Sequence, residues 1–399
     1  MLANKTIVLG ITGGIAAYKA ADLASKLTQA GARVEVVMTE SATKLIAPLT
    51  LHTLTRTKVV VDMFTTPLEY EVTHVSIAEA ADVVVIAPAT ANTIAKIAAG
   101  IADNMLTAVV LATKAPVIIA PAMNVNMWQN PITQENAAKL KARGFAIVDP
   151  AYGRLASGKM GQGRLAEIET IIGTIKQVLG RKGDLARKRI VVTAGGTQEP
   201  IDPVRHIGNR SSGKMGYAVA EAARDRGATV TLITAPTSLP EPVGIEVINV
   251  QTANQMNEVV AKAVIKADAL IMAAAVADYQ SRVVSKAKIK KDAPSLTLEL
   301  VRTPDIITEV KGNFVKVGFA AESEDVVKNA RGKLEKKQLD LMVANDITAT
   351  DSGFGADTNK VTIIDRDGKT EELPLLTKRE VAERILDRVA KLLGKKAGR

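Results

Sequence analysis

The chain has 399 residues, a formal net charge of +10 and no cysteine. Its length favours two domains, and the absence of cysteine excludes disulfides, thiolate zinc sites and cysteine nucleophiles. The basic residues are spread along the sequence rather than gathered beside aromatic residues, which disfavours nucleic acid and favours phosphorylated small molecules as partners. The first residues lack a basic segment followed by a long apolar run. We therefore expect a cytoplasmic protein that does not bind membrane.

Apolar, β-branched runs alternate with helical patterns through the first half of the chain. Such alternation predicts βαβ units with right-handed crossovers and a parallel sheet. The strands that this pattern predicts are Thr6–Ile11, Val34–Met38, Asp82–Ala87 and Pro116–Ala120.

A short polar stretch, GRKGDLARK at residues 180–188, separates this pattern from a second, similar one. We place a first domain at residues 1–180, a linker at 181–188 and a second domain at 189–399. Both halves put glycines after their first strand, and ligands of open α/β sheets bind at the carboxyl ends of the strands. The fold class is α/β with two Rossmann-like domains, and the strands predicted for the second are Ile190–Ala194, Thr229–Thr234, Ala269–Ala275, Val315–Ala320, Leu339–Ala344 and Lys360–Ile364.

Three segments of the first half carry candidate chemistry. The stretch GITGGIAAYK at residues 10–19 joins a strand to a helix through glycines, which can present backbone N–H groups to an anion; the alternative is a purely structural turn. His74 precedes a predicted strand whose exit is PATANT at residues 88–93. The segment PAMNVNMW at residues 121–128 follows another strand and holds the single tryptophan.

In order and spacing these segments, with ADN at residues 102–104, resemble the flavin-containing cysteine decarboxylases over about residues 4–180. The resemblance implies a flavodoxin-like domain that binds FMN and decarboxylates phosphopantothenoylcysteine to 4'-phosphopantetheine. It implies that His74 is the active-site base and that Asn124 binds the carboxylate of the substrate. The residues it implies for FMN are Thr12, Gly13, Gly14, Thr39, Thr90, Ala91, Asn92, Thr93 and Ala122.

The glycine-rich segment at residues 156–164, ASGKMGQGR, departs from that family. Ser157 stands where the family commonly has the cysteine that donates a proton, and a serine hydroxyl is a far weaker acid than a thiol with a pKa near 8.5. Either Lys159, Tyr152 or a water supplies the proton, or the domain only decarboxylates oxidatively and releases an enethiol. A third alternative is a flavin-binding regulator without catalysis.

The second half contains GNRSSGKM at residues 208–215, which nearly matches the phosphate loop G-x-x-x-x-G-K-[ST]. Met215 breaks the match because it has no hydroxyl for magnesium. The donors of this segment still suit an anionic substrate; they are Asn209, Arg210, Ser211, Ser212 and Lys214.

The succession GGTQEPIDPVRHIGNRSSGKMG, AAVADY, KIKK, GFAAE and AND resembles the phosphopantothenate–cysteine ligases over about residues 188–394. KIKK read by itself is a solvated turn. The resemblance implies CTP with Mg²⁺, and it gives Asn209 and Lys288 catalytic roles through an acyl-cytidylate. The residues it implies for phosphopantothenate or CTP are Asn209, Arg210, Ala273, Ala274, Asp278, Lys288, Pro304, Asp305, Ile306, Ile307, Phe319, Lys333 and Lys337.

Together the two resemblances imply one bifunctional enzyme of coenzyme A biosynthesis. Its ligase would join 4'-phosphopantothenate to cysteine, and its decarboxylase would act on the product. The related decarboxylases place FMN at contacts within trimers, and the related ligases dimerise. Combining three-fold with two-fold contacts gives a homo-oligomer such as a dodecamer.

Overall fold

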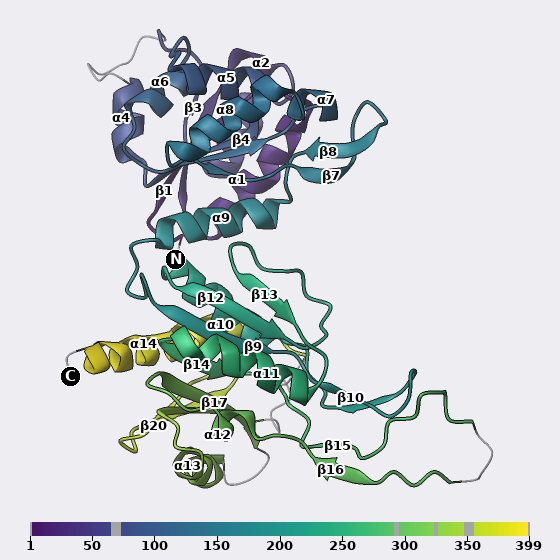
Figure 1. The fold of residues 1–399 in the computed structure, drawn as a ribbon. Coiled ribbons are helices and arrows are strands. Elements are labelled where there is room, and N and C mark those ends of the chain that lie inside the picture. The colour runs from purple at the N-terminus through teal and green to yellow at the C-terminus, as the bar shows by residue number, and fades with distance from the viewer. Residues whose placement is uncertain (1, 65–72, 291–294, 323–325, 347–354, 398–399) are drawn as a thin grey trace. The chain divides into compact units, whose positions relative to one another are not determined.

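A computed structural model describes residues 2–64, 73–290, 295–322, 326–346 and 355–397. The chain divides into two compact units, residues 1–179 and 180–399 (Figure 1). In the described part of the chain, no helix is both long and apolar enough to cross a membrane.

The first unit is built on a parallel sheet with strand order β3-β2-β1-β4-β5-β6. All four strands that the sequence predicts are present, and two-residue strands extend both edges. The α/β fold class is thereby confirmed for this unit. The strands are β1 (Thr6–Ile11), β2 (Arg33–Met38), β3 (Val59–Val60), β4 (Val83–Ala89), β5 (Val117–Pro121) and β6 (Ala146–Ile147).

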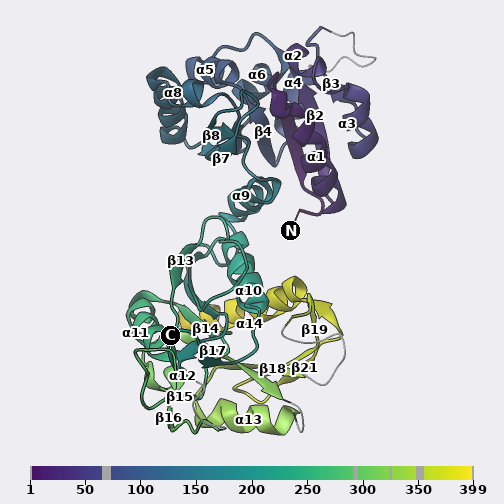
Figure 2. The same cartoon turned by 90° about the vertical axis from the view of Figure 1, so that its right-hand side faces the viewer.

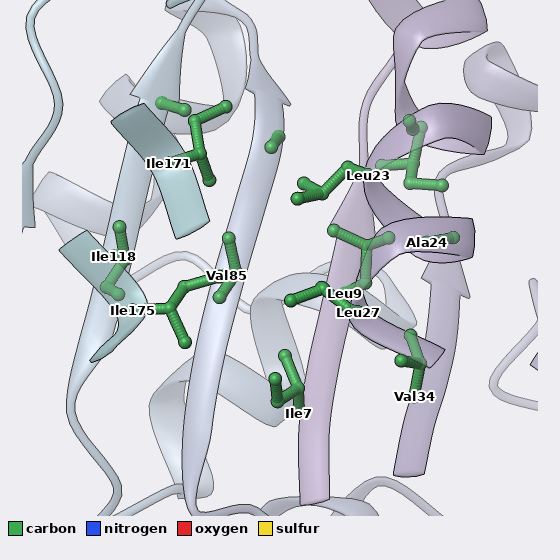
Figure 3. Packing of buried hydrophobic residues seen from close by; sticks show 14 of the residues in the cluster. Ile7, Leu9, Leu23, Ala24, Leu27, Val34, Val85, Ile118, Ile171 and Ile175 are labelled. Atoms are coloured by element: carbon green, nitrogen blue, oxygen red, sulfur yellow. The ribbon is translucent and has the colours of Figure 1, made fainter. Parts of the chain in front are cut away.

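Helices cover both faces of this sheet because its strands are apolar on both sides. Ile7 and Leu9 of β1 pack against one layer, to which α1 contributes Leu23 and Leu27 (Figure 3). Val8 belongs to the core on the opposite face. The first layer holds α1 (Lys19–Gln29), α3 (Pro48–Thr55) and α9 (Ile168–Gly180); the second holds α4 (Thr73–Ala80), α5 (Ala91–Ala99), α6 (Met105–Ala112) and α8 (Pro131–Ala142).

Shorter elements lie at the carboxyl ends of these strands. A 3-10 helix follows β1, and a four-residue helix follows each of β2 and β5. An antiparallel hairpin carries the glycine-rich segment. These elements are η1 (Ile15–Tyr18), α2 (Glu40–Thr43), α7 (Val125–Trp128), β7 (Ala151–Arg154) and β8 (Met160–Arg164).

The second unit has a larger sheet with order β13-β12-β9-β14-β17-β18-β20-β21. The first six strands in this order are parallel. β20 pairs antiparallel with both of its neighbours, β18 and β21. The strands are β9 (Arg189–Ala194), β12 (Thr229–Thr234), β13 (Glu246–Asn249), β14 (Ala269–Met272), β17 (Val315–Glu322), β18 (Leu341–Asp346), β20 (Val361–Asp365) and β21 (Thr370–Glu372).

Two sequence expectations for this sheet need correction. The segment at residues 360–364 does not continue the parallel pattern, because β20 pairs antiparallel with β18. It also pairs antiparallel with β21, since residues 366–369 are too few for a parallel crossover. The strand predicted for Ala269–Ala275 ends at Met272. Beyond it, Ala274 N donates to Thr193 Oγ1 at 3.1 Å, so the backbone leaves the regular ladder.

Two helical layers also cover the second sheet (Figure 2). α10 (Lys214–Asp225) and α14 (Lys378–Ala397) pack side by side on one face, and α11 (Ala253–Ala263), α12 (Ile306–Glu309) and α13 (Val326–Lys336) cover the other. The remaining elements are η2 (Val264–Lys266) and three antiparallel pairs: β10 (Gln198–Pro200) with β11 (His206–Gly208), β15 (Tyr279–Ser281) with β16 (Leu300–Arg302), and β19 (Thr358–Asn359) with β22 (Leu376–Thr377).

The stretch expected to be a linker, residues 181–188, packs on the second unit. Leu185 is fully buried in that unit's core and donates its backbone N–H to Arg226 O at 3.1 Å. Asp184 pairs with the Arg226 guanidinium at 2.5 Å. These contacts fix the start of the second unit against α10.

Candidate functional site

In the first unit, Thr12 joins the ends of two neighbouring strands. Its hydroxyl donates to Pro88 O at 2.7 Å and accepts from Thr90 N at 3.0 Å. Thr12 is buried, while Thr90 is partly exposed at the N-cap of α5. The exits of β1 and β4 are therefore held together, and α5 starts from that junction.

Gly13 and Gly14 permit a close approach of backbone at the same edge. A Cβ on Gly13 would lie only 2.4 Å from Ser41 Cβ. A Cβ on Gly14 would lie 3.4 Å from Thr90 Cγ2 and 3.8 Å from Ala122 O. Residues that follow β1, β2, β4 and β5 thus meet at one place.

The remaining residues implied for the cofactor lie at this edge too. Thr39 follows β2 and donates its backbone N–H to Ile11 O at 3.0 Å. The hydroxyls of Thr90 and Thr93 are 3.2 Å apart. Ala91 and Asn92 form the first turn of α5, where Asn92 is exposed. Hydroxyl groups, glycine backbone and a helix start are the donors that suit a phosphate-bearing ligand.

Asn124 and Ser157 are also brought together. Asn124 Nδ2 donates to Ser157 Oγ at 3.3 Å. The β7–β8 hairpin lies against α7, because Met123 N donates to Gly163 O at 2.9 Å. Only glycine fits at 163, since a Cβ there would stand 2.3 Å from Met123 O. Tyr152 and Lys159, the other candidate proton donors, lie exposed on the same hairpin.

His74 lies apart from this group. It is in the first turn of α4, which packs on α6, and α6 in turn contacts β2. Asn124 follows β5, and β1 and β4 separate β2 from β5 in the sheet. Three strand spacings amount to about 14 Å. Figure 1 accordingly shows α4 and α7 at opposite sides of the first unit.

The second unit contains a pocket of about 950 Å³ at the carboxyl ends of its central strands. Of the thirteen residues that the sequence implies for substrate binding, twelve line this pocket. They come from the segment before α10, the exit of β14, the start of α12, strand β17 and helix α13: Asn209, Arg210, Ala273, Ala274, Asp278, Pro304, Asp305, Ile306, Ile307, Phe319, Lys333 and Lys337.

Hydrogen bonds fix several of these residues. Asn209 Nδ2 donates to Val276 O at 3.0 Å, which joins the segment before α10 to the exit of β14. Lys337 Nζ lies 3.1 Å from Asp305 Oδ1 and so bridges α13 to α12. The pocket wall therefore carries cations, carboxylates and amides, the groups that can bind a polyanionic ligand.

Lys288 is the exception: it is exposed and does not line the pocket. Its neighbour Ile289 is held by a clamp, because Ile289 N donates to Asp202 Oδ2 at 3.1 Å and Arg205 Nη2 donates to Ile289 O at 3.0 Å. Arg205 and Asp202 are 2.6 Å apart. The hydrogen bond from Arg205 is the main reason that the pKa of Asp202 lies far below its usual range. Lys291, the last residue of KIKK, lies outside the described residues.

The sequence does not predict several other residues of the pocket as ligand contacts. Lys378 opens an ordinary amphipathic helix, KREVAERIL, and Asn359 stands in the polar string DTNK. Neither setting carries a signal that distinguishes it from a solvated surface. Asn345 belongs to the AND segment, whose pattern does not indicate which of its residues contacts a ligand. Lys214, expected to suit an anion, does line the pocket.

No group of three or more histidine, aspartate or glutamate side chains that could hold a metal ion occurs within the described ranges. A Mg²⁺ ion commonly uses one or two carboxylates together with substrate phosphates and water. Asp278 and Asp305 offer such carboxylates in the pocket.

Two family models match the chain. "Flavoprotein" matches residues 1–180, and "DNA/pantothenate metabolism flavoprotein C-terminal domain" matches residues 185–393. The chain is 47% identical over 398 residues to the "Coenzyme A biosynthesis bifunctional protein CoaBC" of Bacillus subtilis, covering 98% of both proteins. It is 44% identical over 399 residues to the protein of that name from Vibrio vulnificus, covering 98% of this chain and 99% of that one. For Mycolicibacterium smegmatis the identity is 43% over 419 residues and the coverage 100% of each.

Proposed function

Because this chain belongs to the family of bifunctional coenzyme A biosynthesis proteins, we propose that its first unit works with FMN and its second with CTP and Mg²⁺. The chain is an enzyme of coenzyme A biosynthesis that contains a flavoprotein domain. Its two activities are phosphopantothenoylcysteine decarboxylation and phosphopantothenate–cysteine ligation. The proposal adds the cofactors and the residues.

The ligase proposal rests on the convergence of twelve implied residues in one pocket. A carboxylate is a poor electrophile until its oxygen carries a good leaving group, so CTP is consumed before the cysteine amine attacks. Lys333 and Lys337 would offset negative charge that builds up on the phosphates. Asp278 and Asp305 would help to hold Mg²⁺. Asn209, anchored to Val276 O, would contact the phosphopantothenate carboxylate and the acyl-cytidylate made from it.

The decarboxylase proposal rests on the convergence of the residues implied for FMN at one edge of the sheet, around the junction that Thr12 makes between the exits of β1 and β4. FMN held there would supply the oxidation of the cysteinyl thiol that makes loss of carbon dioxide possible. Asn124 would donate to the departing carboxylate without adding a charge. His74 would accept the proton lost from the oxidised carbon.

The separation of His74 from Asn124 supports a shared site. A catalytic base must come within hydrogen-bond reach of the proton it removes, and α4, which carries His74, lies at the opposite side of the first unit from α7, which Asn124 precedes (Figure 1). We propose that His74 of one protomer completes the site that holds Asn124 of its neighbour. Decarboxylase trimers joined through ligase dimers would give a closed assembly such as a dodecamer.

Mass analysis of products tests both halves. Purified protein supplied with phosphopantothenate, cysteine and CTP should give phosphopantothenoylcysteine and then 4'-phosphopantetheine, with CMP and pyrophosphate as by-products. The protein as purified should be yellow with non-covalently bound FMN. Protein with no flavin absorbance and no uptake of added FMN would contradict the first half, and a strict preference for ATP would contradict CTP as the nucleotide.

A further inference from the structure

One end of the ligase pocket holds two lysines that the ligase resemblance does not assign. Lys214 is the first residue of α10 and Lys378 the first residue of α14. The two helices pack side by side on the face of the sheet opposite α12 and α13 (Figure 2). Lys333, Lys337 and Asp305 belong to that opposite side. The pocket therefore has a second, separate cationic end.

Both lysines contact a single short segment, residues 355–358. Lys214 Nζ lies 2.7 Å from Asp357 Oδ1 and donates to Gly355 O at 2.9 Å. Lys378 Nζ donates to Ala356 O, and to Thr358 O at 3.3 Å. The Asp357 side chain is 88% exposed, so solvent competes for it and an incoming carboxylate could replace it. The position beside Lys214 thus already accepts a carboxylate.

The burial of Lys378 favours an anionic ligand at this end of the pocket. Lys378 is 6% exposed, and its burial, together with the charge of Lys214, lowers its pKa below the ordinary value. A carboxylate placed between the two ammonium groups would offset both effects, because an opposite charge at close range favours the charged form of lysine.

Two buried amide oxygens of the pocket have no hydrogen-bond donor among the residues that the structure describes. Asn359 is 4% exposed and lines the pocket; its Nδ2 donates to Met215 Sδ at 3.6 Å, but its Oδ1 has no partner among the described residues. The buried Oδ1 of Asn345, also in the pocket, is in the same state. Buried acceptors are nearly always satisfied. These two oxygens call for a ligand that donates hydrogen bonds.

The cations and the acceptors together match a zwitterion. A phosphate group would satisfy the lysines but has no N–H groups for the asparagine oxygens. An α-amino acid supplies both a carboxylate and an amine. Resting on the proposed ligase function, we propose that this end of the pocket is the subsite for cysteine. Its carboxylate binds Lys214 and Lys378, and its amine donates to Asn359 and Asn345.

In this subsite, each neighbouring residue contacts a different group of the bound cysteine. The amine, held by two neutral acceptors, keeps its lone pair available once it loses a proton. The thioether of Met215, already beside Asn359, offers an apolar and polarisable wall to a thiol side chain. Asp357 acts as a resident counter-charge that the substrate carboxylate displaces.

The test measures KM for each ligase substrate in the full-length protein and in Lys214→Met and Lys378→Met. Each variant should raise the KM for cysteine at least about tenfold, the loss expected for a charge-assisted hydrogen bond. The KM values for phosphopantothenate and CTP should stay within about twofold. Cysteamine, which lacks the carboxylate, is the probe: the preference of the native enzyme for cysteine over cysteamine should shrink in both variants. Asp357→Asn should lower the KM for cysteine.

Lys360→Gln is the matched control, because Lys360 is exposed, follows Asn359 directly and does not line the pocket. An increase in the KM of CTP or phosphopantothenate in place of cysteine would overturn the proposal and assign the lysines to a phosphoryl group. An unchanged KM for cysteine would also overturn it. If Lys378→Met does not fold, the KM for cysteine in Lys214→Met decides the test, because Lys214 is partly exposed and its replacement should be tolerated.

Pyrophosphate release from phosphopantothenate and CTP before cysteine is added separates this inference from the proposed function. If the native enzyme releases none, the ligase assignment itself fails. If all variants release it at the native rate while the KM for cysteine is unchanged, the ligase stands and the cysteine subsite is wrong.

Discussion

The two units use the same construction and reach different results. Each has a parallel core sheet, a glycine turn after its first strand and its polar side chains at the carboxyl ends of the strands. In the second unit, twelve implied residues line one pocket of a single chain. In the first unit, the cofactor residues meet but His74 and Asn124 stand strands apart. A similar fold therefore does not decide whether all the residues of a site come from one chain.

The largest effect should come from His74. His74→Ala should lower decarboxylation by at least roughly a hundredfold, the usual contribution of a positioned base, and leave ligation unchanged. Co-expression of His74→Ala chains with Asn124→Ala chains should restore about a quarter of the native activity, because random mixing pairs two unmutated residues in about one contact in four. Activity that stays at the level of either variant would show that the site lies within one chain.

The second unit should behave in the opposite way. Asn209→Asp places a charge beside the substrate carboxylate, so ligation should fall by about a hundredfold while decarboxylation is spared. Mixing Asn209→Asp chains with Lys337→Met chains should give no rescue, because both residues line the same pocket. Rescue in this experiment would mean that the ligase site is also shared, and the contrast between the units would disappear.

A smaller effect concerns Ser157, at the junction of the hairpin with Asn124. Ser157→Ala removes one neutral hydrogen bond and should lower decarboxylation by less than about tenfold. A hydroxyl is too weak an acid to protonate the enethiol carbon. The comparison is with Lys159→Met and Tyr152→Phe, scoring phosphopantetheine against its enethiol, which is lighter by two hydrogens. Enethiol accumulating in Ser157→Ala alone would make serine the donor, and enethiol from the native enzyme would make the domain an oxidative decarboxylase.

The smallest expected effect is on acid stability of the second unit. Arg205 holds the pKa of Asp202 below its ordinary value in the folded state. A lowered folded pKa contributes stability that is present above the unfolded pKa, about 4, and is lost as the pH falls. Calorimetry should therefore show the melting temperature of the second unit falling more between about pH 5 and pH 3 in the native protein than in Asp202→Asn. If the melting temperature changes with pH equally in both proteins, the ion pair of Asp202 with Arg205 does not contribute to acid stability. The transition of the first unit serves as the internal reference.

The sequence located most of the fold because local patterns carry it. Runs such as Thr6–Ile11 and Thr229–Thr234 are rich in β-branched and apolar residues, and each is a strand with the predicted bounds. The antiparallel edge at β20 was missed because its residues have the same apolar pattern as a parallel strand. Only the length of the connection to β21 and the pairing with β18 fix its direction.

For the sites, the motifs of the sequence indicated the chemistry of each half through their resemblance to two known families, and a parallel sheet brings the residues that follow its strands to one edge. The sequence could not determine which of these residues lie close together in the folded chain. The resemblance assigns Lys288 to the site and leaves Lys378 out, yet Lys288 is exposed and does not line the pocket, whereas Lys378 is buried and lines it. Likewise, only the folded chain shows that α4 with His74 and α7 after Asn124 lie at opposite sides of the first unit (Figure 1). These placements depend on contacts between residues tens or hundreds of positions apart, which packing of the whole sheet decides and no local pattern encodes.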